Sequence, residues 1–386
     1  SMMTGWDEAL PQSVEIIEVG PRDGFQILTD WIETADKVRI INSLIGAGIR
    51  RMEVTSFVHP KAVPQLRDAA EVVQGADREH CACFAMVPNL KGAERAIEAG
   101  IGMLNLIVSS SESHNRSNVR MSIAESLDGF GPVLAVARQA GVPVRASMST
   151  VFGCPFEGDV PVARVLEIGR RLLDIGCVEL NLCDTTGMAN PRQVAHLAWQ
   201  AREALGAEQV VMHFHNTRGI GAANLLAALQ AGINRFEASF GGLGGCPFAP
   251  GAAGNVATED MVHMLSEMGI ETGIHLPALL DAVRAAAEHF GDTINTWEIG
   301  RNINSSRGIS PFLSPLDPDR LLNPDPAFYT KLLVSASKII HSIDASDQVW
   351  MGSLTGLAAN ECLLSPLTFL LEVNAAGGWR YVDAIP

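Results

Sequence analysis

Residues 210–239 read VVMHFHNTRGIGAANLLAALQAGINRFEAS and contain one full unit of the pattern from which the fold can be predicted. The apolar run Val210–His215 predicts a strand, and the Ala- and Leu-rich stretch Ile220–Ala231 predicts an amphipathic helix. Gly232 stands where a helix C-cap is expected, and a second predicted strand, Arg235–Ser239, follows at once. This order predicts parallel strands joined by a crossover helix.

The same unit recurs along the chain before this stretch. The predicted strands are Val14–Val19, Arg51–Thr55, Cys81–Met86, Met103–Val108, Val142–Ser147, Val178–Leu182, Val210–His215 and Arg235–Ser239. The helices between them include Thr34–Ala47, Leu90–Ala99, Ile123–Ala140, Pro161–Ile175, Pro191–Ala204 and Ile220–Ala231. Several of these helices end in Ala-Gly followed by Val or Ile, a C-cap pattern. Eight such units close a parallel sheet into a TIM (β/α)8 barrel of the α/β class.

The composition suits one large α/β barrel with an appendage. The 386 residues are 47% hydrophobic and 18% charged, which allows a large core. The net charge of −15 disfavours nucleic acid as a partner, and no apolar run reaches the roughly 20 residues that span a bilayer. The short acidic N-terminus is typical of neither a signal nor a transit peptide, and seven scattered cysteines favour a reducing compartment. We therefore expect a cytoplasmic protein without nucleic-acid or membrane partners.

Two parts are expected along the chain: a barrel within residues 1–308 and a mainly helical C-terminal extension in residues 309–386. The extension opens with several prolines, continues with a helical pattern over Ala327–Ser342, and carries an apolar stretch, Leu363–Val373. Packing on the outside of the barrel, a subunit contact and a cover over the substrate entrance are the alternatives for it. The sequence assigns it no role.

Polar side chains gather where the predicted strands end, the side of such a barrel that carries the chemistry. Strand one is followed by Arg22, Asp23 and Gln26, which can place a cation, a carboxylate and an amide around one point. Glu53 lies inside the apolar strand two, where a carboxylate is costly unless it is paired or hydrogen-bonded. Asp184 follows strand six and adds a further carboxylate.

Strand seven and the segment after strand eight add imidazole, thiol and amide groups. His213 and His215 are two residues apart in a strand, so both point inward and can bind one ion. The glycine-dense segment 241–255 carries Cys246 and Asn255 and is typical of a flexible lid. Each feature alone has a structural explanation, since paired histidines are common and a single cysteine usually fills apolar space. Their coincidence at four strand ends and one lid predicts a shared metal site.

Several of these segments resemble the 3-hydroxy-3-methylglutaryl-CoA lyase family, within a wider group of metal-dependent barrel lyases and Claisen-type synthases. The resemblance runs from about Val14 to His289. Its most specific part is residues 241–260, GGLGGCPFAPGAAGNVATED, a signature that separates the lyases from the synthases. Residues 20–24 (GPRDG), 53–58 (EVTSFV), 88–92 (PNLKG) and 153–158 (GCPFEG) also follow the lyase pattern.

The resemblance implies a carbon–carbon lyase that cleaves a 3-hydroxyacyl-CoA, foremost 3-hydroxy-3-methylglutaryl-CoA, into acetyl-CoA and an oxo acid such as acetoacetate. The residues implied to hold a divalent ion, Mg2+ or Mn2+, are Asp23, His213, His215 and Asn255. Arg22 would polarise the thioester carbonyl, and Cys246 would assist proton transfer near the departing group. Glu53 and Asp184 would complete the polar shell, and Gln26 would lie near the ion. A homodimer is expected from the resemblance alone.

The expected chemistry explains these residue types. Breaking the C2–C3 bond of a tertiary 3-hydroxyacyl thioester requires a base for the hydroxyl proton and a site for an enolate. A metal on the hydroxyl lowers its pKa, Arg22 stabilises the negative thioester oxygen, and a closing lid keeps bulk water away. His213, Asp184 and Cys246 are all candidates for the group that takes the first proton.

Three segments depart from the pattern of the familiar acetoacetate-forming enzymes. Asn216-Thr217-Arg218-Gly219 stands where they carry Asp-Thr-Tyr-Gly, Ser147 replaces a tyrosine near the acyl portion, and the loop Ser111–Asn118 has an unfamiliar middle. Ser147 and Asn216 are therefore expected beside the substrate. A smaller Ser147 and an added Arg218 would suit a larger or differently charged acyl group, and drift outside the contact shell is the alternative.

Other activities follow from these departures. Citramalyl-CoA-like and isoprenoid-extended esters are alternative substrates for the same mechanism. A Claisen-type synthase that joins acetyl-CoA to a 2-oxoacid is the alternative enzyme, and the signature around Cys246 counts against it. A barrel that binds CoA esters without turnover is disfavoured because the implied metal ligands, Arg22 and Cys246 are all present.

Overall fold

Eight strands, each paired in parallel with the next, close into a barrel in the computed structural model of the chain. The strands are β1 (Glu15–Glu18), β2 (Arg51–Ser56), β3 (Ala82–Met86), β4 (Met103–Ser109), β5 (Val144–Ser149), β6 (Glu179–Cys183), β7 (Val210–His213) and β8 (Arg235–Ala238). The ring closes where β1 pairs with β8, from Glu15 opposite Arg235 to Glu18 opposite Ala238. The predicted TIM barrel and all eight predicted strands are confirmed.

The structure describes residues 10–28, 31–244, 254–289, 296–299 and 348–351. The chain divides into two units, 1–283 and 284–386, and the barrel belongs to the first. In the second, the described strands β9 (Thr296–Ile299) and β10 (Gln348–Met351) form a parallel pair. The boundary predicted at residue 308 and the predicted segments 327–342 and 363–373 lie outside the described residues, so the extent and helical character of the extension stay predictions.

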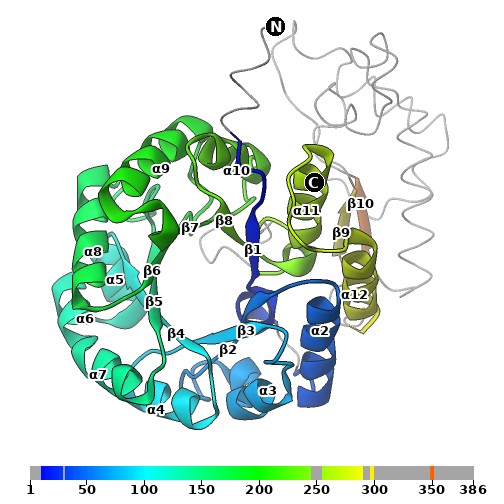
Figure 1. Cartoon of the computed structure of the whole chain (residues 1–386), viewed down its shortest axis with the longest axis horizontal. Helices are drawn as coiled ribbons and strands as arrows, with labels where there is room; N and C mark the ends of the chain where they lie inside the picture. The colour runs from blue at the N-terminus through cyan, green and yellow to red at the C-terminus, as the bar shows by residue number, and fades with distance from the viewer. Residues whose placement is uncertain (1–9, 29–30, 245–253, 290–295, 300–347, 352–386) are drawn as a thin grey trace, which may run out of the picture. The chain divides into compact units, whose positions relative to one another are not determined.

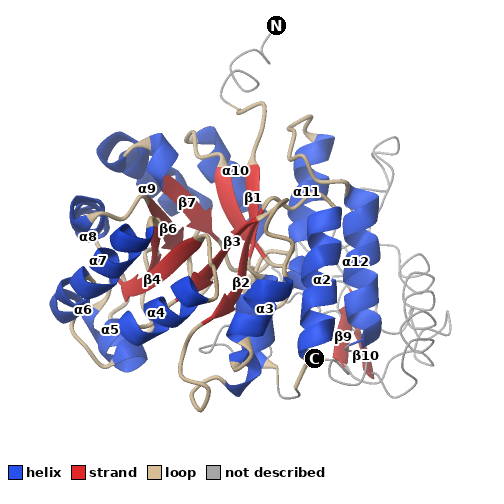
Figure 2. Cartoon of the chain, turned by 60° about the horizontal axis from the view of Figure 1, so that its bottom comes forward, coloured by secondary structure: helices blue, strands red, loops and turns tan. Residues whose placement is uncertain are grey.

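Helices surround the strands of the barrel (Figure 1), and a view turned by 60° shows the strands enclosed by them (Figure 2). The helices are α2 (Thr34–Gly46), α3 (Ala69–Gly75), α4 (Leu90–Glu98), α5 (Glu112–Val119), α6 (Ile123–Gly129), α7 (Gly131–Ala140), α8 (Val162–Ile175), α9 (Pro191–Leu205), α10 (Gly221–Gln230), α11 (Thr258–Glu267) and α12 (Leu276–His289). None of the helices in the described part of the chain has both the length and the hydropathy needed to cross a membrane.

The Ala-Gly pattern at helix ends marks where the chain leaves a helix for the next strand. Gly48, Gly100, Gly141 and Gly232 all have positive φ, between 69° and 111°. A residue with a Cβ rarely adopts this conformation, so glycine ends the helix at these positions. The local sequence therefore sets the spacing between helix and strand before any packing occurs.

One predicted loop and one predicted helix were wrong. The segment Ser111–Asn118, expected to be a loop, contains helix α5, whose N-cap is Ser111 and whose Asn115 is buried. The Asn115 amide accepts from the Ser109 N–H and donates to the Ser126 hydroxyl, contacts that an apolar periodicity does not reveal. The helix predicted over Ile123–Ala140 is two helices, because Pro132 lacks the N–H that a continuous helix needs.

A buried carboxylate ties the ends of β1 and β8 to helix α11. Oε1 of Glu18 accepts from the backbone N–H groups of Gly20 (2.7 Å) and Phe240 (3.0 Å), and Oε2 accepts from the Thr258 hydroxyl (2.6 Å). Glu18 is fully buried. Burial raises the pKa of its carboxyl to about 7, although these three hydrogen bonds act to lower it.

This raised pKa predicts a pH-dependent stability. The folded state keeps the Glu18 proton to a higher pH than the unfolded chain does. The contribution of this group to the stability of the fold is therefore complete below pH 4.5 and is lost as the pH rises to about 7. The rise corresponds to roughly 3 kcal/mol. Glu18→Gln can still accept both N–H groups and can donate to Thr258. We therefore expect Glu18→Gln to gain stability relative to the wild type as the pH rises, so that its free energy of unfolding minus that of the wild type is larger at pH 8 than at pH 5.

Urea unfolding of both proteins at the two pH values measures this change. Glu94→Gln, at an exposed position on α4, is the control and should show no such change. An equal difference between Glu18→Gln and the wild type at pH 5 and pH 8 would contradict the prediction.

Candidate active site

Three side chains from opposite ends of the barrel sequence meet at the carboxyl ends of the strands. Asp23 lies in the short helix η1 (Gly20–Gly24) after β1, His213 ends β7, and His215 lies two residues beyond it. One ligand atom from each lies within 4.8 Å of the others. The two imidazole rings are 5.1 Å apart between centroids. This arrangement is compact enough to hold one metal ion.

The polar atoms around these three residues fit a cation. The Asn255 amide nitrogen donates to Asp23 Oδ2 (2.7 Å) and to the Leu243 carbonyl (2.9 Å), so its Oδ1 is left as an acceptor. Oδ1 of Asn255 and Nδ1 of His215 are buried without a hydrogen-bond partner. Buried acceptors without donors are costly, and a divalent cation would satisfy them. The residues present therefore fit a metal.

Arg22 lies beside the same group and is oriented by two carboxylates. Its Nε donates to Glu53 Oε2 (2.6 Å) and its Nη1 to Asp23 Oδ1 (2.8 Å). Burial acts to lower the pKa of this guanidinium, but Glu53 and Asp23 outweigh it and raise that pKa, so Arg22 stays charged. Nη2 donates to none of the residues that the structure describes. Nη2 of the fixed Arg22 guanidinium is therefore available to donate to a ligand.

These residues form the wall of a cavity of about 430 Å³. Arg22, Asp23, His213 and His215 contribute the polar wall. A second, mainly apolar part of the lining consists of Val58, Val63, Met86, Val87, Pro88, Ile107, Val119, Met121 and Phe130. A charged region joined to an apolar one suits a substrate with a polar reacting end and a less polar body.

Two further predicted residues reach this cavity. Gln26 lines it and donates through Nε2 to Asp23 Oδ1 (3.1 Å), and Ser147 lines it from β5. Glu53 does not line the cavity but accepts a hydrogen bond from Arg22 inside the barrel. A buried glutamate was expected to have such a partner. Cys246 lies outside the described residues, as does most of the predicted lid.

Three other predicted residues do not line the cavity. Asp184 is buried, its Oδ1 accepts from the Ala189 N–H, and burial raises the pKa of its carboxyl to about 6. Oδ1 of Asn216 accepts from the Gly221 N–H at the start of α10. Arg218 is exposed and donates to the carbonyl oxygens of Thr186 and Gly187. Arg218 thus joins two loops and does not reach an acyl group.

A model of the family described as HMGL-like matches residues 13–285. This chain belongs to the HMGL-like family. The match confirms the resemblance, which was placed from Val14 to His289.

Relatives of this HMGL-like protein include named lyases. It is 48% identical over 282 residues to the hydroxymethylglutaryl-CoA lyase of Bacillus subtilis, covering 73% of this chain and 94% of that protein. It is 43% identical over 274 residues to the 3-hydroxy-3-isohexenylglutaryl-CoA/hydroxymethylglutaryl-CoA lyase of Pseudomonas aeruginosa, covering 71% and 91%. A solved HMG-CoA lyase from Acinetobacter baumannii, in complex with coenzyme A and 3-methylmalate, is 44% identical with a TM-score of 0.70, covering 72% and 92%.

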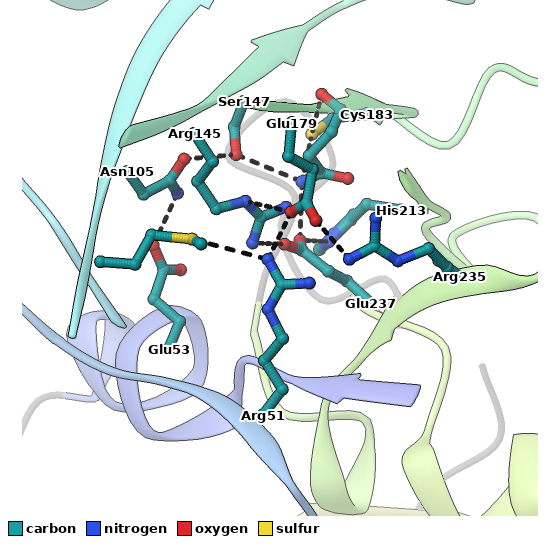
Figure 3. A network of polar contacts seen from close by, with 12 residues as sticks. Arg51, Glu53, Asn105, Arg145, Ser147, Glu179, Cys183, His213, Arg235 and Glu237 are labelled. Carbon is teal, nitrogen blue, oxygen red and sulfur yellow. Dashed lines mark hydrogen bonds and ion pairs between the residues drawn. The ribbon is translucent and has the colours of Figure 1, made fainter. Parts of the chain in front are cut away.

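A run of hydrogen-bonded polar residues in this HMGL-like chain joins Glu53 and Ser147 to three residues that were not predicted from the sequence, Asn105, Asn181 and Glu237 (Figure 3). Glu53 Oε1 accepts from Asn105 (2.7 Å), and the Ser147 hydroxyl donates to Asn105 Oδ1 (3.0 Å). Asn181 then donates to the Ser147 hydroxyl (3.2 Å) and to Glu237 Oε2 (2.7 Å). The run crosses β2, β4, β5, β6 and β8 and so links the partner of Arg22 to the far side of the barrel.

The signal for these residues was present in the sequence. Asn105, Asn181 and Glu237 each stand inside a short apolar strand, as Glu53 does. The same reasoning that singled out Glu53 would have marked them as inward-facing groups in need of partners. Which of them contact one another follows from barrel register, which the sequence does not give.

Proposed function

We propose that this chain cleaves 3-hydroxy-3-methylglutaryl-CoA to acetyl-CoA and acetoacetate. The observation that carries the proposal is the placement of Arg22 beside Asp23, His213 and His215 on the wall of one cavity. Family membership and two relatives named as lyases of this ester support it.

We assign the ion to Asp23, His213, His215 and Asn255, whose free acceptors suit Mg2+ or Mn2+. A bound divalent cation supplies positive charge that lowers the pKa of the substrate hydroxyl. Gln26 and Arg22 share Asp23 Oδ1, and Asn255 donates to Oδ2, so the carboxylate is fixed before a ligand arrives.

The 3-hydroxyl gives its proton to a base, for which the sequence offers His213, Asp184 and Cys246. The C2–C3 bond then breaks, and its electrons pass to C2 while C3 becomes the ketone of acetoacetate. The negative charge then lies on the enolate of acetyl-CoA, and we assign the Arg22 guanidinium to the thioester oxygen. Protonation of C2 completes acetyl-CoA, and we assign the Cys246 thiol to that step from its place in the lyase signature.

Ser147 supports an ester with a longer C3 substituent as a second substrate. Its small side chain lines the cavity, as do the apolar residues Ile107 and Phe130. The relative from Pseudomonas aeruginosa is named for an isohexenylglutaryl ester as well as the methyl one. Arg218 gives no support to a differently charged acyl group. The cytoplasmic location and the homodimer stay predictions of the sequence.

Metal-dependent acetyl-CoA release tests this function. After treatment with EDTA, the protein should release no acetyl-CoA from 3-hydroxy-3-methylglutaryl-CoA, and Mg2+ or Mn2+ should restore release. Parallel reactions contain the isohexenyl and citramalyl esters, and a last one contains acetyl-CoA with 2-oxoacids. Release from another ester alone would reassign the substrate, consumption of acetyl-CoA would favour the synthase, and metal-independent release would contradict the ion's role.

A further inference from the structure

One nitrogen of the His213 ring contacts a buried carboxylate. Its Nδ1 lies 2.8 Å from Glu237 Oε2, and both side chains are buried. The contact leaves Nε2 as the ring nitrogen that can serve Asp23 and His215 in the group of three. Glu237 thus determines which nitrogen of His213 is offered to an ion.

Glu237 is itself fixed by partners on two other strands. Asn181 donates to Oε2 (2.7 Å), and the Arg145 Nη1 lies 2.8 Å from Oε1. Arg145 is fully buried and also contacts Glu179: its Nε lies 2.9 Å from Oε1 of Glu179. A buried carboxylate in contact with a buried guanidinium keeps its charge, so both oxygens of Glu237 remain acceptors.

We propose that Glu237 is a positioning residue for the metal centre, which holds the neutral His213 ring by its Nδ1–H so that Nε2 faces the ion. This inference rests on the proposed metal-dependent lyase activity. A carboxylate behind a histidine ligand fixes ring orientation and increases the basicity of the ligating nitrogen. His213 on β7 and Glu237 on β8 are 24 positions apart in the sequence, and this contact makes them act as one unit.

The substitution Glu237→Gln tests the charge rather than the size of the side chain. An amide has one acceptor oxygen and one donor nitrogen, whereas Glu237 faces donors on both sides. If the amide oxygen faces His213 and Asn181, its nitrogen meets Arg145. If the amide is turned over, its nitrogen meets His213 and Asn181. The first orientation keeps the His213 hydrogen bond but removes the negative charge behind the ring and places a donor against Arg145. The second places donor against donor at Nδ1 and releases the His213 ring.

Glu179 provides a matched control within the same ion network. It is as buried as Glu237 and pairs with Arg51 (2.7 Å), Arg145 and Arg235, but it does not touch His213 (Figure 3). Glu179→Gln removes an equal charge from the network. A merely structural role for these carboxylates would therefore affect both variants alike.

Binding of Mn2+ to the metal-free full-length proteins separates these possibilities. Free Mn2+ is followed by electron paramagnetic resonance during titration of the wild type, Glu237→Gln and Glu179→Gln, and thermal unfolding is measured alongside. We expect the Kd for Mn2+ to rise about 10- to 100-fold in Glu237→Gln. We expect Glu179→Gln to bind Mn2+ with the Kd of the wild type, even if its thermal stability is lower.

A second variant covers the case in which Glu237→Gln does not fold. Glu237→Asp keeps the charge beside Arg145 but withdraws the carboxylate by one methylene from Nδ1, so it should fold and bind Mn2+ more weakly. Equal Mn2+ affinity in the wild type and the Glu237 variants, or equal losses at Glu237 and Glu179, would overturn the inference. Absence of Mn2+ binding by the wild type would instead overturn the proposed metal site.

Discussion

Removal of the Asp23 carboxylate is expected to lower kcat by about 10³-fold or more, because a metal supplies several kcal/mol of stabilisation to the transition state. Arg22, Gln26 and Asn255 hold Asp23 Oδ1 and Oδ2, and among the described residues Asp23 is the one carboxylate in the group of three that could hold an ion. The loss should fall on kcat rather than on KM, since the ion acts on the hydroxyl as its proton leaves. Steady-state kinetics of Asp23→Ala with saturating Mn2+ measures this.

The matched control is Asp174→Ala, the same substitution at an exposed position on α8. It should keep the wild-type kcat. Metal content is measured in both variants, and only Asp23→Ala should lose bound Mn2+. Near-normal kcat in Asp23→Ala would remove the metal hypothesis for this site.

Replacement of Arg22 by glutamine is expected to lower kcat by about 10²- to 10³-fold, the usual cost of losing one oxyanion donor. The guanidinium is buried, charged and oriented by Glu53 and Asp23. It therefore needs no reorganisation when negative charge develops on the thioester oxygen. Kinetics of Arg22→Gln with 3-hydroxy-3-methylglutaryl-CoA measures the loss.

Arg22→Lys distinguishes charge from geometry in this prediction. Lysine keeps one positive charge but cannot contact both carboxylates while it presents a further donor, so its activity should lie between the wild type and Arg22→Gln. The Mn2+ affinity of both variants is also measured, to separate a direct effect of Arg22 on kcat from an effect through loss of the ion. A kcat for Arg22→Gln within tenfold of the wild type would show that Arg22 does not stabilise the enolate.

Local sequence signals predicted more of the fold than of the site. The strand runs and the Ala-Gly ends of helices act within a few residues, and they placed all eight strands. Helix α5 was missed because its sequence is polar and its stability comes from the Ser111 cap and the buried Asn115. Such contacts involve residues outside the helix, so the spacing of apolar residues along the helix does not predict them.

The candidate site divides in the same way. Asp23, His213 and His215 were found from residue types beside strand ends, and the barrel brings them together as expected. Asn216 and Arg218 follow the same strand yet face loop backbone rather than the cavity. The direction of a loop side chain depends on the turn that carries it, and that turn depends on the loops packed beside it.

Residue patterns in the sequence were sufficient to predict the barrel, the side on which its chemistry lies, and the identity of most groups that reach the candidate metal centre. These follow from strand alternation and from the placement of loops after parallel strands. The contacts of Glu53 with Arg22 and of Glu237 with His213 became known only from the folded chain. The two pairs lie 31 and 24 residues apart, and their contact depends on the register in which neighbouring strands pair around the closed barrel.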